Sequence, residues 1–485
     1  MSITSALSAA VSGLSANARA AGVVSSNVAN AQTPGYARRE LELSTRYVDG
    51  STGGVQVDGV RRVVDKALIQ DRQLADSALA NSDTRTQYLS AASDLWGSPE
   101  SDLSLSGRIR QFDASLIEAA SRPDEPSRLT AVGAAAQALT DALNAASAGV
   151  QDLREEADAA IARDVALLNA SLAQVQDLNG QISRQNGAGR DVAALLDERQ
   201  RVVDTIAEIV PVRSFARDDD RIALVTTGGA VLIDGTAREI EFAGTGVITA
   251  DMTLASGALS DLEIDGRGTP ANGTFAPLGG GRLGALFEVR DTLAVADQAR
   301  LDGVARDLVD RFADPAIDPT RAPGDPGLFT DGGLAFAPAD EIGLSRRIDV
   351  NALVDPARGG ALFRLRDGLG AAAPGPGGDA TLLQSFSDAL GAQRVAASPA
   401  LDAGAEAFDA LVAELTSRAA SDLRISEREQ GFRAAFQLGL AEQEAAGGVD
   451  TDQELQKLIL IEQNYAANAR VIQVIDDMLQ QLVRI

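Results

Sequence analysis

Residues 458–485 read LILIEQNYAANARVIQVIDDMLQQLVRI, and their apolar side chains recur in alternating steps of three and four, with Asn468 in one of the apolar positions. Residues 3–28 repeat this spacing, with Asn17 as the polar member. A seven-residue repeat of this kind is typical of a coiled-coil seam, in which a single Asn fixes the register. We therefore predict that both ends of the chain are helical and pair in space. Two ordinary amphipathic helices in one globular core are the alternative.

The composition excludes many kinds of chemistry. The chain has 485 residues and a net charge of −26, and it contains neither histidine nor cysteine. Catalytic Ser-His-Asp and Cys-His systems, Cys/His zinc sites and disulfides are therefore impossible. A chain this acidic lacks the basic surface that phosphate contacts need, so we expect no nucleic-acid partner.

Neither a membrane span nor a secretion signal stands out in the sequence. No stretch approaches the roughly 18 continuous apolar residues of a transmembrane helix. The first residues have no basic residue before Arg19, and serines interrupt their apolar positions. A cleaved signal needs a basic start and an unbroken apolar run. We expect a chain without membrane insertion that is not exported by a cleaved signal.

Between the ends, apolar positions at helical spacing predict further long helices. The strongest stripe runs from Val150 to Ile182. Asp191 is placed to cap a shorter helix that Pro211 ends. The predicted helices cover residues 66–95, 127–186, 192–210, 282–312 and 401–446.

The centre of the chain has a different composition. Residues 212–265 are rich in Val, Ile, Thr and Gly, which predicts strands at 222–226, 231–233 and 239–242. Residues 313–380 are rich in proline and glycine and indicate a loop-rich outer insertion. The entropic cost of closing a loop grows only slowly with the length of the loop. We therefore expect that replacing 316–376 by a short linker would be tolerated.

Three local patterns could carry chemistry, and each has a simpler interpretation. The acidic run Asp218–Asp220 lacks calcium-loop spacing and is interpreted as a solvated turn. Glycines 279–281 lack the Lys-Ser/Thr ending of a phosphate loop and are interpreted as a flexible helix start. No pair of carboxylates is singled out for glycosidase chemistry. We predict no catalytic, cofactor-binding or metal-binding residues and no cofactor.

The segment NVANAQTPGYARRE, residues 27–40, has the features of a helix end followed by a turn. Pro34 fixes φ, Gly35 permits a turn conformation and Tyr36 supplies a large amphipathic side chain. An ordinary helix C-terminus is the alternative, and local physics alone assigns no function to it.

Two motifs carry a family resemblance. SGLSANARAAGVVSSNVANAQTPGYARRE, from Ser12, resembles the N-terminal motif of flagellar rod, hook and hook-associated proteins, and residues 462–485 resemble the matching C-terminal motif. The resemblance is strongest to the family members that join hook to filament. Similar segments in those members are the Gly-Tyr-x-Arg ending (Gly35, Tyr36 and Arg38) and the interior segments 53–65, 192–210 and 280–293. Residues 313–380 depart from the family, being shorter than its usual outer insertion.

The resemblance implies a structural, non-enzymatic subunit of the hook–filament junction that acts as a mechanical adaptor and a template for the filament. Its expected partners are other copies of itself in a helical or ring polymer, the hook protein, hook-associated protein 3 and an export chaperone at the C-terminal helix. Such proteins are exported through the flagellar channel and lie outside the cell. A hook or distal-rod protein is one alternative, and a secreted enzyme with flagellar-type ends is another.

The expected fold is mainly α with an inserted β region, paired terminal coiled-coil helices, a long-helix bundle and an outward insertion. The expected domains are residues 1–47 with 447–485, residues 48–312 with 381–446 including a β subdomain at about 211–280, and residues 313–380. The residues expected to form the assembly interface are Ile3, Leu7, Leu14, Val24, Asn27, Val28, Asn30, Pro34, Gly35, Tyr36, Leu458, Ile461, Tyr465, Asn468, Ile472, Ile475, Leu479 and Leu482.

Overall fold

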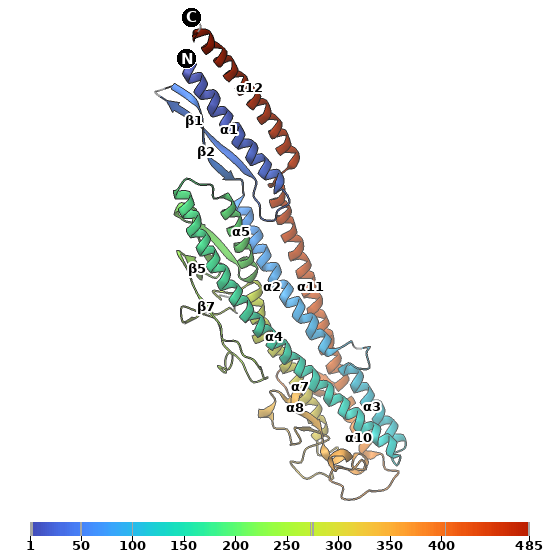
Figure 1. The fold of residues 1–485 in the computed structure, drawn as a ribbon. Coiled ribbons are helices and arrows are strands. Elements are labelled where there is room, and N and C mark those ends of the chain that lie inside the picture. The colour runs from blue at the N-terminus through green and yellow to red at the C-terminus, as the bar shows by residue number, and fades with distance from the viewer. Residues whose placement is uncertain are drawn as a thin grey trace.

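The computed structural model describes residues 3–48, 51–98, 100–271, 273, 276–402 and 404–483. It is an elongated molecule with both chain ends near one tip and a loop-rich region at the other (Figure 1). The prediction of a mainly α fold with an inserted β region is confirmed. The longer helices are α1 (Ile3–Ala29), α2 (Lys66–Trp96), α3 (Leu105–Ser121), α4 (Pro126–Gly187), α5 (Ala193–Ile209), α6 (Gly281–Glu288), α7 (Ala294–Ala313), α10 (Thr381–Gly391), α11 (Phe408–Ala446) and α12 (Thr451–Val483).

The terminal helices α1 and α12 pack against each other, as the matching heptads predict. A β-hairpin that was not predicted lies against α1 as well (Figure 1). Its strands are β1 (Arg39–Val48) and β2 (Ser51–Arg62), paired antiparallel. The Ser12 hydroxyl of α1 accepts a hydrogen bond from the backbone N–H of Val55 in β2 over 3.1 Å. The hairpin crosses residue 48, where the sequence suggests a domain boundary.

The long helices of the middle layer begin and end close to their predicted positions. The Asp65 side chain caps α2 by accepting hydrogen bonds from Ala67 and Leu68, and α2 ends at Trp96 before Gly97. α4 matches the predicted helix at 127–186. α5 begins at Ala193, one residue later than the predicted start at 192. The Asp191 side chain accepts a hydrogen bond from the Ala193 N–H over 2.8 Å.

The core of this layer is the apolar stripe of α4. From Val150 to Ile182 the predicted positions are buried, except Leu153, which is half-buried. Two arginines are also fully buried here. Arg154 donates to the carbonyl of Arg290 over 3.0 Å, and the Arg290 guanidinium pairs with Asp158 at 2.6 Å. Their hydrogen-bond partners explain how these charges can lie in the interior.

The β region forms two small antiparallel sheets beside α4 (Figure 1). The predicted strands at 222–226 and 231–233 are confirmed, whereas 239–242 contributes a shorter strand. One sheet has the order β3 (Val212–Ala216), β4 (Ile222–Thr226), β5 (Val231–Asp234), β6 (Thr236–Ala237), and the other β7 (Ile240–Glu241), β8 (Glu263–Ile264), β9 (Arg267–Gly268).

Two helices depart from their predicted form. The predicted helix at 282–312 is α6 and α7 joined by a π-helical segment, Val289–Leu293. α11 begins at Phe408, not at 401, because residues 405–406 form a strand. That strand, β13 (Ala405–Glu406), pairs with β12 (Arg394–Val395).

Residues 313–380 pack into the main core, which contradicts the expectation that this segment could be replaced by a linker. Phe329 is fully buried. Its ring packs edge-on against the rings of Phe112 and Phe312, with ring centroids 5.7 and 5.0 Å apart. Proline and glycine shape the loops of this segment, but they do not reveal how many apolar side chains the loops carry inward. Its regular elements are β10 (Phe329–Asp331), α8 (Leu344–Arg347), β11 (Ile348–Val350) and α9 (Arg364–Asp367).

Candidate assembly interface

The register of α1 against α12 is fixed at two places. The side-chain amide of Asn468 lies over Gly13, where an added Cβ would come within 2.8 Å of its nitrogen. Asn27 reaches Glu454 at the other end of the pair. Asn27 lies 14 residues after Gly13, and Glu454 lies 14 residues before Asn468. Residue numbers therefore rise along α1 where they fall along α12, so the two helices are antiparallel (Figure 1). The polar member of the C-terminal heptad therefore sits at a close helix crossing.

Most of the predicted seam lies between the two helices. Val24 and Ile475 are buried. Tyr465 and Leu479 are exposed instead, by 48% and 39%. The antiparallel register carries Leu479 beyond Ile3, so no described residue of α1 is available to cover it. The half-buried positions are Ile3, Leu7, Leu14, Val28, Leu458, Ile461, Asn468 and Ile472; the side chain of Leu482 lies outside the described residues.

Asn27 is the centre of a buried hydrogen-bond network. Its side-chain nitrogen donates to Glu454 Oε2 over 2.8 Å and to the carbonyl of Arg39 over 2.9 Å. Its oxygen accepts from the Tyr36 hydroxyl and from the Arg39 N–H, each over 3.0 Å. One fully buried amide thus joins the end of α1, the following turn, β1 and the start of α12.

The turn after α1 has the conformation that its residues suggest. Gly35 has a φ of 76°, and an added Cβ would lie 2.6 Å from Cγ of Arg201. Pro34 is exposed. Asn30 donates to the Ser26 carbonyl over 2.9 Å, which closes the last turn of α1. A glycine is required here both for the backbone conformation and for the approach to α5.

Asp197 on α5 ties this turn and the hairpin to the helical bundle. It pairs with Arg39 at 3.0 Å and with Arg62 at 2.7 Å, and it accepts a hydrogen bond from the Ala37 N–H over 3.3 Å. Burial lowers the pKa of the Arg62 guanidinium, and the nearby Asp197 carboxylate opposes that change. The connection between the two layers is therefore made by charges from three elements.

A second set of ion pairs holds the start of α2. Arg72 pairs with Asp76 at 2.6 Å, with Asp204 of α5 at 2.8 Å, and with Glu444 near the end of α11. Burial works against the charged guanidinium, but the carboxylates outweigh it and raise the pKa of Arg72. Arg72, Asp204 and Glu444 line a cavity of about 610 Å³ between the terminal layer and the bundle.

The face of α12 turned away from α1 is also apolar. Leu460, Val471, Val474 and Met478 are 59%, 45%, 57% and 41% exposed. Val471, Val474 and Met478 follow one another in steps of three and four, so they lie along one stripe of the helix. α12 therefore has two apolar stripes, and only one is covered by described residues of this chain.

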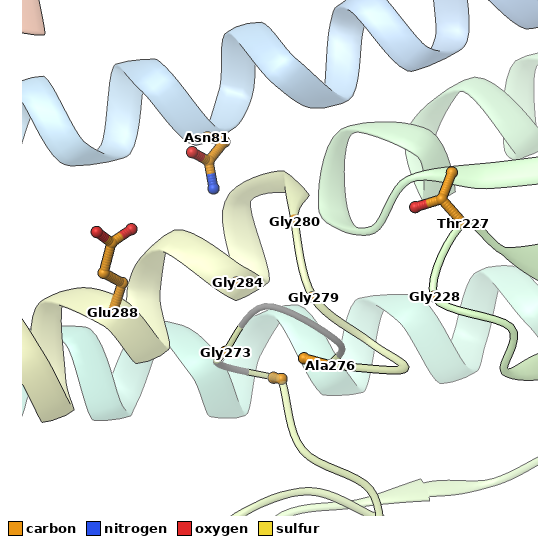
Figure 2. A pocket seen from close by; sticks show the side chains of 10 residues that line it. Asn81, Thr227, Gly228, Gly273, Ala276, Gly279, Gly280, Gly284 and Glu288 are labelled. Carbon is orange, nitrogen blue, oxygen red and sulfur yellow. The ribbon is translucent and has the colours of Figure 1, made fainter.

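A separate pocket of about 540 Å³ lies at the start of α6 (Figure 2). Gly281 has a φ of 61°, and an added Cβ would lie 2.3 Å from the Ile209 carbonyl oxygen. Asn81 of α2 donates to the Gly281 carbonyl over 2.9 Å, and the Glu288 carboxylate also lines the pocket. The glycines thus serve a tight helix start, and a carboxylate at the wall disfavours a phosphate.

The acidic run Asp218–Asp220 forms an exposed turn before β4, in agreement with its interpretation from the sequence. Among the described residues no group of three or more acidic side chains is placed to hold a metal ion. None of the described helices has the length and apolar character needed to cross a membrane.

Sequence reasoning missed Glu454, Asp197 and Arg72. Glu454 had a detectable signal, because it lies seven residues before Ile461 and so takes a position of the apolar repeat. Its carboxylate is buried and pairs with Lys457 at 2.6 Å. Asp197 and Arg72 gave no such signal, since their partners lie far away in the sequence.

Three family models match the chain. Residues 90–318 match the flagellar hook-associated protein FlgK helical domain. Residues 7–36 match the flagella basal body rod protein, and residues 446–485 match the C-terminal segment of the flagellar basal body rod FlgEFG protein. The two terminal matches contain the helices and the turn that the Asn27 network connects.

Curated relatives named flagellar hook-associated protein 1 are also similar. The protein of Salmonella typhimurium is 30% identical over 49% of this chain and 44% of its own length. That of Escherichia coli K12 is 26% identical over 54% and 49%, and that of Bacillus subtilis 27% identical over 48% and 48%. The alignments thus span about half the length of these relatives. A flagellar hook junction protein structure from Burkholderia pseudomallei is 20% identical, with a TM-score of 0.44 over 54% of this chain and 47% of the other.

Proposed function

We propose that this chain, which belongs to the family of flagellar hook-associated proteins, is a structural subunit of the junction between the flagellar hook and the filament. In this proposal the terminal segments 1–47 and 447–485 form the inner wall of a tubular polymer. The β-hairpin that packs on α1 belongs with that wall. The bundle of residues 66–446, whose core includes side chains of 313–380, surrounds the wall, and the loops of 313–380 face outward. The subunit would act as a mechanical adaptor between hook and filament and as a template for filament growth.

The outer apolar stripe of α12 carries the proposal. A helix that is apolar on two sides needs two neighbours, and α1 covers one side. Val474, which is 57% exposed, represents the side that a neighbouring subunit would cover. Because such a contact joins different surfaces of identical subunits, it repeats into a helical polymer or closes into a ring.

The partners in this proposal are further copies of the chain, the hook protein on one side and hook-associated protein 3 on the other. An export chaperone would bind the C-terminal helix before assembly, where exposed apolar residues such as Leu479 could be covered. Export through the flagellar channel, without a cleaved signal, and a location outside the cell follow from the family. The chain would have no enzymatic activity.

A hook or distal-rod protein is the closest alternative. The 62-residue helix α4 and the hook-associated helical domain at residues 90–318 favour the junction role over it. Deleting the gene from its own organism distinguishes the two. A junction protein leaves hooks without filaments in negative-stain images, whereas a distal-rod protein leaves no hooks.

The double variant Val471→Asp with Val474→Asp tests the polymer contact. It places two charges on the outer stripe and should abolish filaments, because an unpaired charge is costly in an apolar contact. The purified variant should melt like the natural protein, since both side chains are exposed in the subunit. Gln473→Asp, on an exposed neighbour outside the stripe, is the matched control. Normal filaments on cells with the double variant would overturn the proposed contact.

A further inference from the structure

The terminal layer, which consists of α1, the β1–β2 hairpin and α12, has no share in the main hydrophobic core. Among the described residues, the buried side chains of that core lie between Tyr88 and Leu415 in the sequence. The layer buries its own apolar side chains, such as Val24 and Ile475, where α1 and α12 pack together. It therefore forms a separate body at one end of the bundle (Figure 1).

The polar contacts between this layer and the bundle converge on one helix, α5. Asp197 pairs with Arg39 of β1 at 3.0 Å and with Arg62 of β2 at 2.7 Å. The Arg62 guanidinium also donates a hydrogen bond to the Gln200 side chain over 2.8 Å. Parts of a chain that meet through a small polar interface can move relative to each other, because separating them exposes little apolar surface.

The side of the joint that faces α11 is open. The cavity of about 610 Å³ extends there, lined by Thr33 of the turn after α1, Leu68 of α2 and Ala441 of α11. No described side chain of the layer makes an ion pair or hydrogen bond with α11 across it. The joint is thus held at α5 and has free space next to α11.

The chain crosses the joint on this open side through two glycines. Gly447 and Gly448 connect α11 to α12, and both line the cavity. Glycine accepts a wide range of backbone angles, and hinges are commonly a few small residues at the ends of elements. The start of α12 is fixed independently, because the Asp450 side chain accepts hydrogen bonds from the N–H groups of Asp452 and Gln453.

We propose that this joint is a hinge, in which the terminal layer tilts into the cavity as one rigid body. The contacts of Asp197 are the pivot, and Gly447 with Gly448 is the flexible connection. The tilt changes the angle between layer and bundle while α1 and α12 stay paired through Asn27 and Glu454. The motion belongs to the single subunit, and only its use in an adaptor between hook and filament rests on the proposed function.

Spin labels on the purified subunit test the tilt, and no natural cysteine competes with the labelled sites. The pair Ala18→Cys on α1 and Ala173→Cys on α4 spans the joint. Ala173→Cys with Ala420→Cys lies within the bundle, and Ala18→Cys with Ala466→Cys lies within the layer; all four positions are exposed. Electron paramagnetic resonance should give a broader distance distribution for the spanning pair than for either control pair. Equal widths in all three pairs, or a layer pair as broad as the spanning pair, would overturn the rigid-body hinge.

Filling the cavity should stop the motion. Ala441→Phe places a ring in the cavity, so the distribution of the spanning pair should narrow to the width of the bundle pair. Ala435→Phe is the matched control, because Ala435 is exposed on the same helix outside the cavity lining and its replacement should leave the width unchanged. Circular dichroism checks that both variants are folded. A folded Ala441→Phe variant with an unchanged distribution would show that the layer does not move into this space.

Removing the pivot should have the opposite effect. Asp197→Ala leaves Arg39 and Arg62 without their shared carboxylate, so the distribution of the spanning pair should broaden beyond that of the natural protein. The neighbouring Glu198→Ala is the control, because Glu198 pairs with Arg201 of the same helix. Equal distributions in these two variants would refute the role of Asp197. Since all these measurements use the isolated subunit, their failure would leave the junction role, which gene deletion tests, untouched.

Discussion

The side-chain nitrogen of Asn27 donates a hydrogen bond to Oε2 of Glu454 over 2.8 Å, and both side chains are buried. One residue belongs to the N-terminal family segment and the other to the C-terminal one. Asn27 also accepts hydrogen bonds from the Tyr36 hydroxyl and the Arg39 N–H. A single amide therefore fixes how the two ends of the chain meet.

Replacing Asn27 by alanine should loosen the terminal pair. The change leaves the Arg39 N–H and an oxygen of Glu454 buried without this partner, which costs about 2–3 kcal/mol. Amide hydrogen exchange should become faster in α1 and α12 and stay unchanged in α4. Asn30→Ala is the control, because that amide bonds within one helix turn and is only half-buried. Equal exchange in the two variants would contradict the central role of Asn27.

Adjacent residues on α12 should respond differently to truncation. Ile475 is 3% exposed and faces α1, whereas Val474 is 57% exposed. Ile475→Ala should destabilise the terminal pair by about 2–4 kcal/mol, because it leaves a cavity at a packed contact. Val474→Ala should change the stability of the isolated subunit by less than about 0.5 kcal/mol. Urea denaturation followed by hydrogen exchange measures both, and a reversed order would show that the helix faces are assigned wrongly.

The terminal layer was largely predictable because its signals are local and repeated. The heptads identified both helices and their pairing, and the sequence of the turn anticipated the conformation of Gly35. The hairpin was missed even though Asp49-Gly50 lies between its strands, a dipeptide that favours hairpins. The contacts of Asp197 were not predictable, because they join residues whose proximity only the tertiary structure creates.

Tyr88 and Asp297 form a buried pair whose contribution to the stability of the fold should depend on pH. The phenol donates to Asp297 Oδ2 over 2.6 Å. Burial raises the pKa of the Asp297 carboxyl, while the hydrogen bond from Tyr88 lowers it in part. A raised pKa means that the folded state binds this proton more tightly than the unfolded state. The contribution of Asp297 to stability is therefore greatest below the ordinary pKa of Asp and is lost as the pH rises through the raised value.

Tyr88→Phe should increase the stability that is lost as the pH rises through the pKa of Asp297. The variant removes a donor to the carboxylate, so it should cost about 1–3 kcal/mol at pH 7 and progressively less as acidification protonates Asp297. Thermal unfolding between about pH 4 and pH 8 measures the difference from the natural protein. Asp297 keeps its ion pair with Arg300 at 2.7 Å in this variant, so the fold should persist. A difference that is constant over the whole range would show that the hydrogen bond does not depend on the charge of Asp297.

The segment 313–380 shows where composition misleads. Its prolines and glycines correctly predict loops, but burial depends on a few scattered residues such as Leu328, Ile348 and Leu365, all fully buried. These residues have no helical or alternating period that would reveal a common face. Only the positions of α3, α7 and α10 around them show that the loops close the end of the core.

Phe329→Ala should therefore be among the more damaging changes in the chain, although it lies in a loop-rich segment. The ring is fully buried and contacts Phe112 and Phe312, so its loss should cost about 3–5 kcal/mol. Leu334→Ala is the matched control from the same segment, since Leu334 is 73% exposed and should change stability by less than about 0.5 kcal/mol. Urea denaturation of both variants gives the comparison. Replacing residues 316–376 by a linker removes Phe329 altogether and should prevent cooperative unfolding of the bundle. A linker variant that unfolds like the natural protein would show that the core is closed without this segment.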